Sequence, residues 1–192
     1  FTSIDYDALA AWRDGSGDLP EHPIMFDFDH PVTTMLEVRD VLGEVGFAGN
    51  LFVNTGPMAP ENASPDTLTW AQIGELVESG WHVGAHTVTH PNLSSLVAED
   101  PQGEKLQWEL ETCDQEIEKE LGITPRGFAF TGTSWSSVAE QKVMERYRFG
   151  RLWIVGSEYQ ADGEKIRYAD LVGVEGDEEA DADTDGVLQW WR

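Results

Sequence analysis

The sequence is poor in cysteine and in basic residues. Its 192 residues include one cysteine, Cys113, so no disulfide can form within the chain. Because Cys113 falls on the apolar stripe of an expected helix, we expect a small buried side chain there rather than a reactive thiol. Lysine and arginine together number 12 against 36 aspartates and glutamates, which gives a formal net charge of −24. That charge would repel nucleic acid and anionic membranes, so both are excluded as partners.

The excess of acid is spread along the whole chain, and only four of the basic residues are lysines. An acidic, lysine-poor surface on an otherwise ordinary globular composition is typical of adaptation to high salt, where screening weakens the repulsion between like charges. We therefore hypothesise a halophilic protein. The hypothesis predicts a higher free energy of unfolding in molar salt than in low salt, measured by denaturant titration. Equal stability in the two conditions would contradict it.

Long hydrophobic runs are absent as well. No stretch of about eighteen apolar residues occurs, so no segment is expected to span a membrane. The first residues, 1–4, do not resemble a signal peptide, but a secreted protein whose leader has been removed would begin in the same way. We favour an extracellular or cell-surface location over a cytoplasmic one.

The composition is sufficient for one domain. Eight tryptophans and eight phenylalanines supply a substantial core, and the sequence has no internal repeat, so residues 1–192 are expected to form a single domain. Residues 175–185 are dominated by aspartate and glutamate with almost no apolar anchor, and they are expected to form a solvated acidic loop.

Short apolar runs alternate with helical patterns through most of the chain. Strands are expected at residues 23–27, 51–54, 81–86, 127–131 and 152–155. Helical patterns occupy residues 35–45, 69–80, 106–121 and the segment that starts at 137. Strands that alternate with helices indicate an α/β fold with parallel strands and right-handed crossovers, either a barrel or an open doubly wound sheet.

Several helix ends are marked by their residues. Thr69 with Gln72 forms a capping-box pattern, and Ser137 with Glu140 forms a second one. Gly122 is suited to end the helix that precedes it, because glycine adopts the left-handed conformation without a steric penalty.

Polar residues that could bind a metal or take part in catalysis follow three of these strands. Asp27 and Asp29 end the first strand, His86 ends the third, and Thr131 with Gly132 follows the fourth. In barrels and in open α/β sheets, functional residues gather at the carboxyl ends of the strands. We therefore expect these side chains to meet at one rim.

The spacing of the acids and imidazoles predicts a metal site. His86 and His90 share a face at a spacing of four residues, on a helix or on a strand, and Asp27 and Asp29 point the same way in an extended segment. Two neighbouring buried carboxylates are costly unless a cation binds one of them. A bound divalent metal would lower the pKa of its water, and the second carboxylate could accept the proton. Two imidazoles and one carboxylate suit Zn²⁺, with Co²⁺, Ni²⁺ or Mn²⁺ as alternatives.

Four segments carry a resemblance to a known family. They are Phe26–Pro31, Gly46–Gly56, Leu68–Gln72 and Glu78–Leu93, of which the last is the most specific. Over residues 22–155 the chain resembles the polysaccharide deacetylase family, that is, the NodB-homology domain of carbohydrate esterase family four. The resemblance implies a deformed, incomplete (β/α) barrel with parallel strands. It also implies a metal-dependent hydrolase that removes N- or O-acetyl groups from an acylated carbohydrate.

The resemblance also implies roles for individual residues. Asp29, His86 and His90 would hold the metal, and Asp27 would be the general base. The first motif departs from the commoner form with adjacent aspartates, because Phe28 lies between them. In an alignment on Pro31, Phe28 would take the place of the base. We prefer the Asp-x-Asp register, which keeps both roles.

The third motif supplies the rest of the site by resemblance. The backbone amide of Gly132 would stabilise the oxyanion, and Thr131 and Trp135 would contact the substrate, although Trp135 fits a core role equally well. No arginine of that motif is evident, and Arg126 precedes the strand, so a pair between Arg126 and Asp27 is not expected.

One expected residue is missing. The family commonly has a histidine near its C-terminal end as the general acid, whereas all five histidines here lie at positions 22, 30, 82, 86 and 90. Either the chain is a fragment, or Asp27 carries the proton in both directions, or His30 substitutes for the acid, or the domain binds glycans without turnover. A deacylase of a small non-sugar amide is a further alternative. The sequence does not indicate an oligomeric state.

Overall fold

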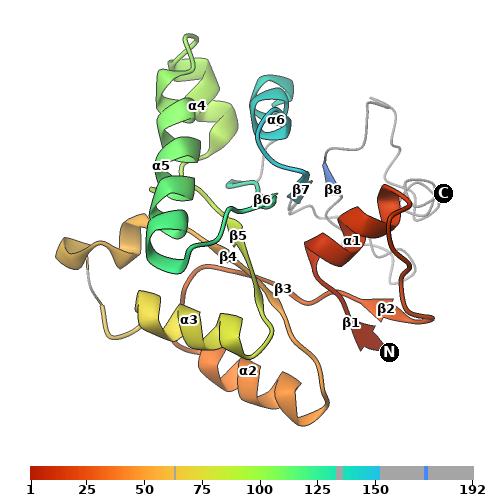
Figure 1. Cartoon of the computed structure of the whole chain (residues 1–192). Coiled ribbons are helices and arrows are strands. Elements are labelled where there is room, and N and C mark those ends of the chain that lie inside the picture. The colour runs from red at the N-terminus through yellow and green to blue at the C-terminus, as the bar shows by residue number, and fades with distance from the viewer. Residues whose placement is uncertain (63, 133–135, 152–170, 173–192) are drawn as a thin grey trace, which may run out of the picture.

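A six-stranded sheet is the centre of the fold. The computed structural model describes residues 1–62, 64–132, 136–151 and 171–172. The strands follow one another in the order β3-β4-β5-β6-β7-β8 (Figure 1). They are β3 (Asp27–Asp29), β4 (Asn50–Val53), β5 (His82–Ala85), β6 (Gly127–Ala129), β7 (Phe149–Arg151) and β8 (Leu171–Val172). The first five are parallel and β8 is antiparallel to β7. The curled parallel sheet confirms the prediction of a deformed, incomplete barrel.

Helices connect the parallel strands, as the alternating pattern predicts. They are α2 (Met35–Glu44), α3 (Trp70–Glu78), α4 (Leu93–Glu99), α5 (Glu104–Leu121) and α6 (Ser137–Met144). Two short 3-10 helices, η1 (Gly56–Met58) and η2 (Pro60–Asn62), precede α3. In the described part of the chain, no helix is long and apolar enough to cross a membrane.

The N-terminal segment forms elements that the sequence pattern did not predict. The helix α1 (Tyr6–Arg13) is capped at its N-terminus by Asp5, whose side chain accepts a hydrogen bond from the amide of Ala8 at 2.7 Å. The strands β1 (Thr2–Ser3) and β2 (Pro23–Ile24) form a separate two-stranded parallel sheet. The prediction of one strand over residues 23–27 is therefore wrong. The structure has two strands there, β2 and β3, which belong to different sheets.

Other boundaries differ by smaller amounts. Helix α6 is capped by Ser136, not by the predicted Ser137, and the Ser136 side chain accepts from the amide of Ala139. The helix α4 was not predicted. The strand expected at 152–155 and the acidic loop expected at 175–185 lie outside the described residues. The strand β7 ends at Arg151, directly before the first of these two segments.

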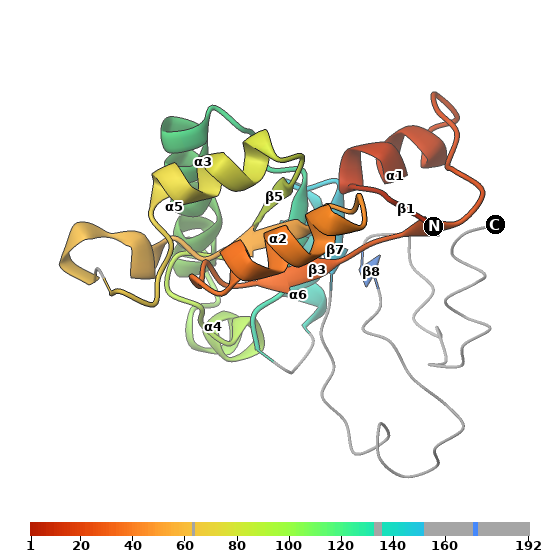
Figure 2. The same ribbon diagram turned by 90° about the horizontal axis from the view of Figure 1, so that it is seen from below.

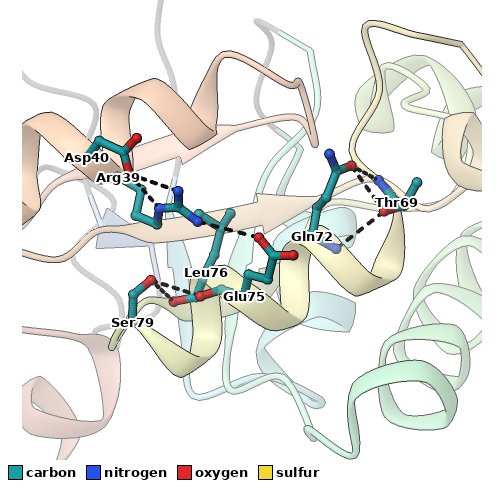
Figure 3. A network of polar contacts seen from close by, with 7 residues as sticks. All are labelled: Arg39, Asp40, Thr69, Gln72, Glu75, Leu76 and Ser79. Carbon is teal, nitrogen blue, oxygen red and sulfur yellow. Dashed lines mark hydrogen bonds and ion pairs between the residues drawn. The ribbon is translucent and has the colours of Figure 1, made fainter.

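The capping box at α3 is confirmed. The Thr69 side chain accepts from the amide of Gln72, and the Gln72 side chain accepts from the amide of Thr69 at 2.8 Å (Figure 3). The same view shows how α3 is tied to α2, because Arg39 Nη1 lies 3.6 Å from a carboxylate oxygen of Glu75. Gly122 ends α5 in the left-handed conformation, at φ 70°, as predicted.

The two faces of the sheet are covered differently. Leu51 and Val53 belong to the large core that the sheet shares with α3 and α5, and Cys113 is buried there, as predicted. Phe52, between them, faces the opposite side. Its ring packs on Tyr6 of α1, with centroids 5.5 Å apart. In Figure 1, α1 lies apart from α2 and α3, whereas α2 and α3 lie side by side in both Figure 1 and Figure 2. We call the side on which Phe52 lies the inner face.

A glycine makes room for Phe52 on the inner face. A Cβ atom at Gly84 would lie 2.5 Å from the Phe52 ring and 3.0 Å from the carbonyl oxygen of Gly127. The ring therefore lies across β5, and it forms an apolar floor below the polar residues of the inner face.

Candidate metal and catalytic site

Three imidazoles meet at the carboxyl ends of β3 and β5. His30 follows β3 directly, His86 follows β5, and His90 lies four residues further on. Their ring centroids are 4.7 to 5.1 Å apart. One ring nitrogen from each lies within 4.8 Å of the other two, which is close enough for all three to hold one metal ion.

His86 presents a bare nitrogen to this cluster. Its Nδ1 lies 2.8 Å from the carbonyl oxygen of Ala129, which can only accept, so Nδ1 carries the proton. Its Nε2 is buried and has no hydrogen-bond partner among the described residues. Burial lowers the pKa of His86 to about 4, so the ring is neutral at pH 7. A neutral imidazole with an unpartnered buried nitrogen is what a divalent metal requires, and the site therefore fits the metal.

The backbone is strained in both segments that carry the imidazoles, the one after β3 and the one after β5. Among the described non-glycine residues, only His30, Thr87 and His90 have positive φ, at 71°, 66° and 60°. Each such conformation costs on the order of 1–3 kcal/mol and persists only where the surroundings enforce it. The strained residues are two of the clustered histidines, His30 and His90, and Thr87, which follows the third. Backbone strain gathered around these imidazoles points to a functional site.

A buried carboxylate on α5 holds the loop of residues 87–90, which follows β5. Glu109 accepts hydrogen bonds from the amides of Val88 at 2.8 Å and Thr89 at 2.9 Å, and also from the Thr89 hydroxyl. Glu109 is only 4% exposed. The loop is closed from within by the bond from the His90 amide to the Thr87 hydroxyl oxygen, at 3.1 Å. The position of His90 therefore depends on a residue that itself lies outside the cluster.

The two aspartates lie on the inner face, beside one arginine. Asp27 and Asp29 point the same way, as predicted, and Arg151 of β7 pairs with both: its Nε lies 3.7 Å from Asp27 Oδ2, and its Nη2 donates to Asp29 Oδ1. Asp27 Oδ2 also accepts from the Tyr6 hydroxyl at 2.7 Å, and Asp27 Oδ1 accepts from the side-chain nitrogen of Asn50 at 2.9 Å. Asp27 is thus held from three sides.

Burial decides the pKa of Asp27. Loss of solvent raises the pKa of this carboxyl above its usual value, and the hydrogen bond from Tyr6, the charge of Arg151 and the bond from Asn50 oppose that rise. A carboxylate with a raised pKa is a stronger base than one in water, which suits proton abstraction.

The remaining predicted residues are placed as follows. The Thr131 hydroxyl donates to the carbonyl oxygen of Pro91, and the residue is buried. Gly132 has φ +86°, and a Cβ there would lie 2.5 Å from the side-chain nitrogen of Asn92, so the position accepts only glycine without rearrangement. Trp135 lies outside the described residues.

Asp29 is the predicted ligand that the structure does not bring into the close group of nitrogens. Its carboxylate pairs with Arg151, although it is near enough to favour the charged form of His86. His30, which the sequence suggested only as a substitute for the general acid, is the third imidazole of the cluster.

Five groups of the site were missed in the sequence: Tyr6, Asn50, Glu109 and Arg151, together with Asn54, whose side-chain oxygen lies 3.1 Å from His30 Nδ1. A signal existed for Glu109, because it lies three residues after Leu106 and four before Cys113 and so falls on the apolar face of the helix. The signal for Arg151 was obscured because the fifth strand was expected to begin at residue 152, whereas β7 begins at Phe149 and includes Arg151. Arg126, the nearer arginine in sequence, pairs instead with Asp7 at 3.2 Å.

Imidazoles and carboxylates at the carboxyl ends of parallel strands are typical of metal-assisted hydrolases. The sequence profile described as polysaccharide deacetylase matches residues 16–147, more than half of the chain. The chain belongs to the polysaccharide deacetylase family. No curated protein sequence matches it.

Solved structures share the fold. The Streptococcus pyogenes deacetylase PplD, in complex with acetate, has a TM-score of 0.69 at 16% identity, with 99% of this chain and 79% of that one covered. BC0361, a polysaccharide deacetylase from Bacillus cereus, gives 0.63 at 20% identity, covering 78% of this chain and 44% of that one. The BpsB deacetylase domain from Bordetella bronchiseptica gives 0.66 at 20% identity, with 78% and 71% covered.

Proposed function

We propose that this chain is a metal-dependent hydrolase that removes N- or O-acetyl groups from a carbohydrate. The observation that carries the proposal is the buried, unpartnered Nε2 of His86, which faces two further imidazoles beside a pair of carboxylates. Family membership supports carbohydrate as the substrate class.

His86 and His90 are the imidazole ligands in this proposal, and the motif of the family adds Asp29. Zinc suits such donors best, with cobalt, nickel or manganese as alternatives. When bound, the metal would polarise the acyl oxygen and supply a water of lowered pKa.

Asp27 is the general base. Its carboxylate is kept in one orientation by Tyr6, Asn50 and Arg151, so no conformational search precedes proton abstraction from the attacking water. The raised pKa of Asp27 makes that proton transfer more favourable. The same carboxyl, protonated in the first step, then returns the proton to the leaving amine or alcohol.

Gly132 supplies the oxyanion donor. Its amide belongs to a residue in the left-handed conformation three positions after the end of β6, at the rim where the imidazoles lie. Hydrogen bonds from preorganised amides to a developing oxyanion contribute several kcal/mol to the stabilisation of a transition state.

Loss of metal after substitution of the ligands tests the proposal. We expect the wild-type protein to bind about one zinc ion, and the variants His86→Ala and His90→Ala to lose it, measured by elemental analysis after dialysis. His22→Ala is the matched control, because the His22 side chain is 62% exposed and is not part of the cluster of His30, His86 and His90. Unchanged metal content in both variants would refute the metal site.

Turnover separates this function from its alternatives. We expect release of acetate from a panel of acetylated chito-oligosaccharides and acetylated xylans when Zn²⁺ is added. Binding of the panel without release would indicate a glycan-binding domain. Turnover of small formamides or ureido compounds alone would indicate a deacylase outside carbohydrate chemistry.

A further inference from the structure

We propose that His30 is a metal ligand, so that three imidazoles, those of His30, His86 and His90, hold the ion while Asp29 remains paired with Arg151. This inference rests on the proposed function, because it reassigns the third ligand of the metal of that site.

The position of His30 is the first argument. Its ring centroid lies 5.1 Å from that of His86 and 4.7 Å from that of His90, and the latter two are 4.8 Å apart. His30 is therefore as much a part of the cluster as the two histidines of the spaced pair. The ligand atoms of all three rings fall within 4.8 Å of one another.

The hydrogen bond on its far nitrogen is the second argument. His30 Nδ1 lies 3.1 Å from the side-chain oxygen of Asn54, a buried residue that follows β4. With that oxygen as acceptor, Nδ1 carries the proton and Nε2 is left bare. His86 has the same arrangement with the carbonyl oxygen of Ala129. Metal-binding imidazoles are commonly oriented by an oxygen acceptor on the other nitrogen in just this way.

The pairing of Asp29 is the third argument. Arg151 donates to Asp29 and its guanidinium also faces Asp27, so its positive charge offsets part of the negative charge of the two acids. A carboxylate in a partly buried ion pair is a weaker ligand than a neutral imidazole with a bare nitrogen, because the metal would have to compete with the guanidinium. Three imidazoles alone also leave a fourth coordination position open, which a catalytic zinc site needs.

The affinity for zinc tests the inference without any measurement of activity. In a chelator competition, we expect His30→Ala to weaken zinc binding at least 100-fold, and Asn54→Leu to weaken it 10- to 100-fold through loss of the orienting oxygen. Asp29→Asn should change the affinity less than tenfold. His22→Ala is again the control, and thermal denaturation of each variant confirms that it is folded.

Cobalt-substituted protein provides a second readout. In the proton NMR spectrum of the Co²⁺ form, we expect the His30→Ala variant to lack one of the strongly shifted imidazole N–H resonances of the wild type. The resonances show which histidines bind the metal, even if small changes in the loops that carry them alter the affinity of a variant.

The outcomes separate the two proposals. A wild-type protein that binds no zinc would overturn the proposed function together with its metal. Zinc binding that His30→Ala leaves intact, while Asp29→Asn abolishes it, would overturn the three-imidazole site and leave the proposed function standing.

Discussion

Replacement of Asp27 with asparagine lowers kcat/KM for an acetylated oligosaccharide by about 10²–10⁴-fold, the contribution typical of a positioned general base. The amide has almost the shape of the carboxylate and retains an oxygen that can accept from the Tyr6 hydroxyl, but it cannot take a proton at neutral pH. Because Asp27 is not among the proposed ligands, zinc content should stay at the wild-type value. Steady-state kinetics and elemental analysis of the same preparation measure both quantities.

The pH profile distinguishes a base from a structural residue. Asp27 must be deprotonated to act, so kcat/KM falls as the pH drops through its raised pKa. Tyr6→Phe removes a hydrogen bond that lowers this pKa, and the acid limb should therefore move to higher pH. An Asp27→Asn enzyme with wild-type kcat/KM, or a Tyr6→Phe enzyme with an unmoved acid limb, would contradict the role of Asp27.

Replacement of Glu109 with leucine lowers the free energy of unfolding by about 1–4 kcal/mol. The buried amide of Val88 loses its acceptor, which costs about 1–3 kcal/mol, and the partly buried amide of Thr89 adds a smaller loss. Leucine fills much of the space, so the loss reports hydrogen bonds more than a cavity. Because the loop also carries His90, zinc affinity should fall 10- to 100-fold.

Urea titration of the metal-free protein and a zinc competition measure these two effects. Glu118→Leu is the matched control, since Glu118 is exposed on the same helix, and its free energy of unfolding should stay within about 0.5 kcal/mol of the wild type. A Glu109→Leu protein with the wild-type midpoint and zinc affinity would show that the loop is held by other contacts.

Much of the fold could be predicted from periodicity. The apolar stripe of α5 and the capping box at Thr69 determine local structure, and both are found as expected. The N-terminal helix was missed because its buried face consists of only Tyr6, Leu9 and Ala10. So short a stripe gives little periodic signal, and the helix is stabilised by what it packs against.

The candidate site was less accessible from the sequence. Asp27 and Asp29 share a face because a strand alternates with period two, and this rule needs no tertiary information. His30 gave no such signal. Its ring reaches the other imidazoles only because β3 and β5 flank β4 and because its backbone takes a left-handed conformation. Neither fact can be derived from spacing along the chain.

The surroundings of Asp27 have a consequence for where the functional unit begins and ends. The family match covers residues 16–147 and includes every proposed metal ligand. Tyr6 and Arg151, two of the three groups that hold Asp27, lie before and after that segment. A domain trimmed to the matched residues would keep the histidines proposed to bind the metal and would lose two of the three side chains that orient Asp27. Under the proposed function, metal occupancy and catalytic competence therefore require different lengths of the same polypeptide.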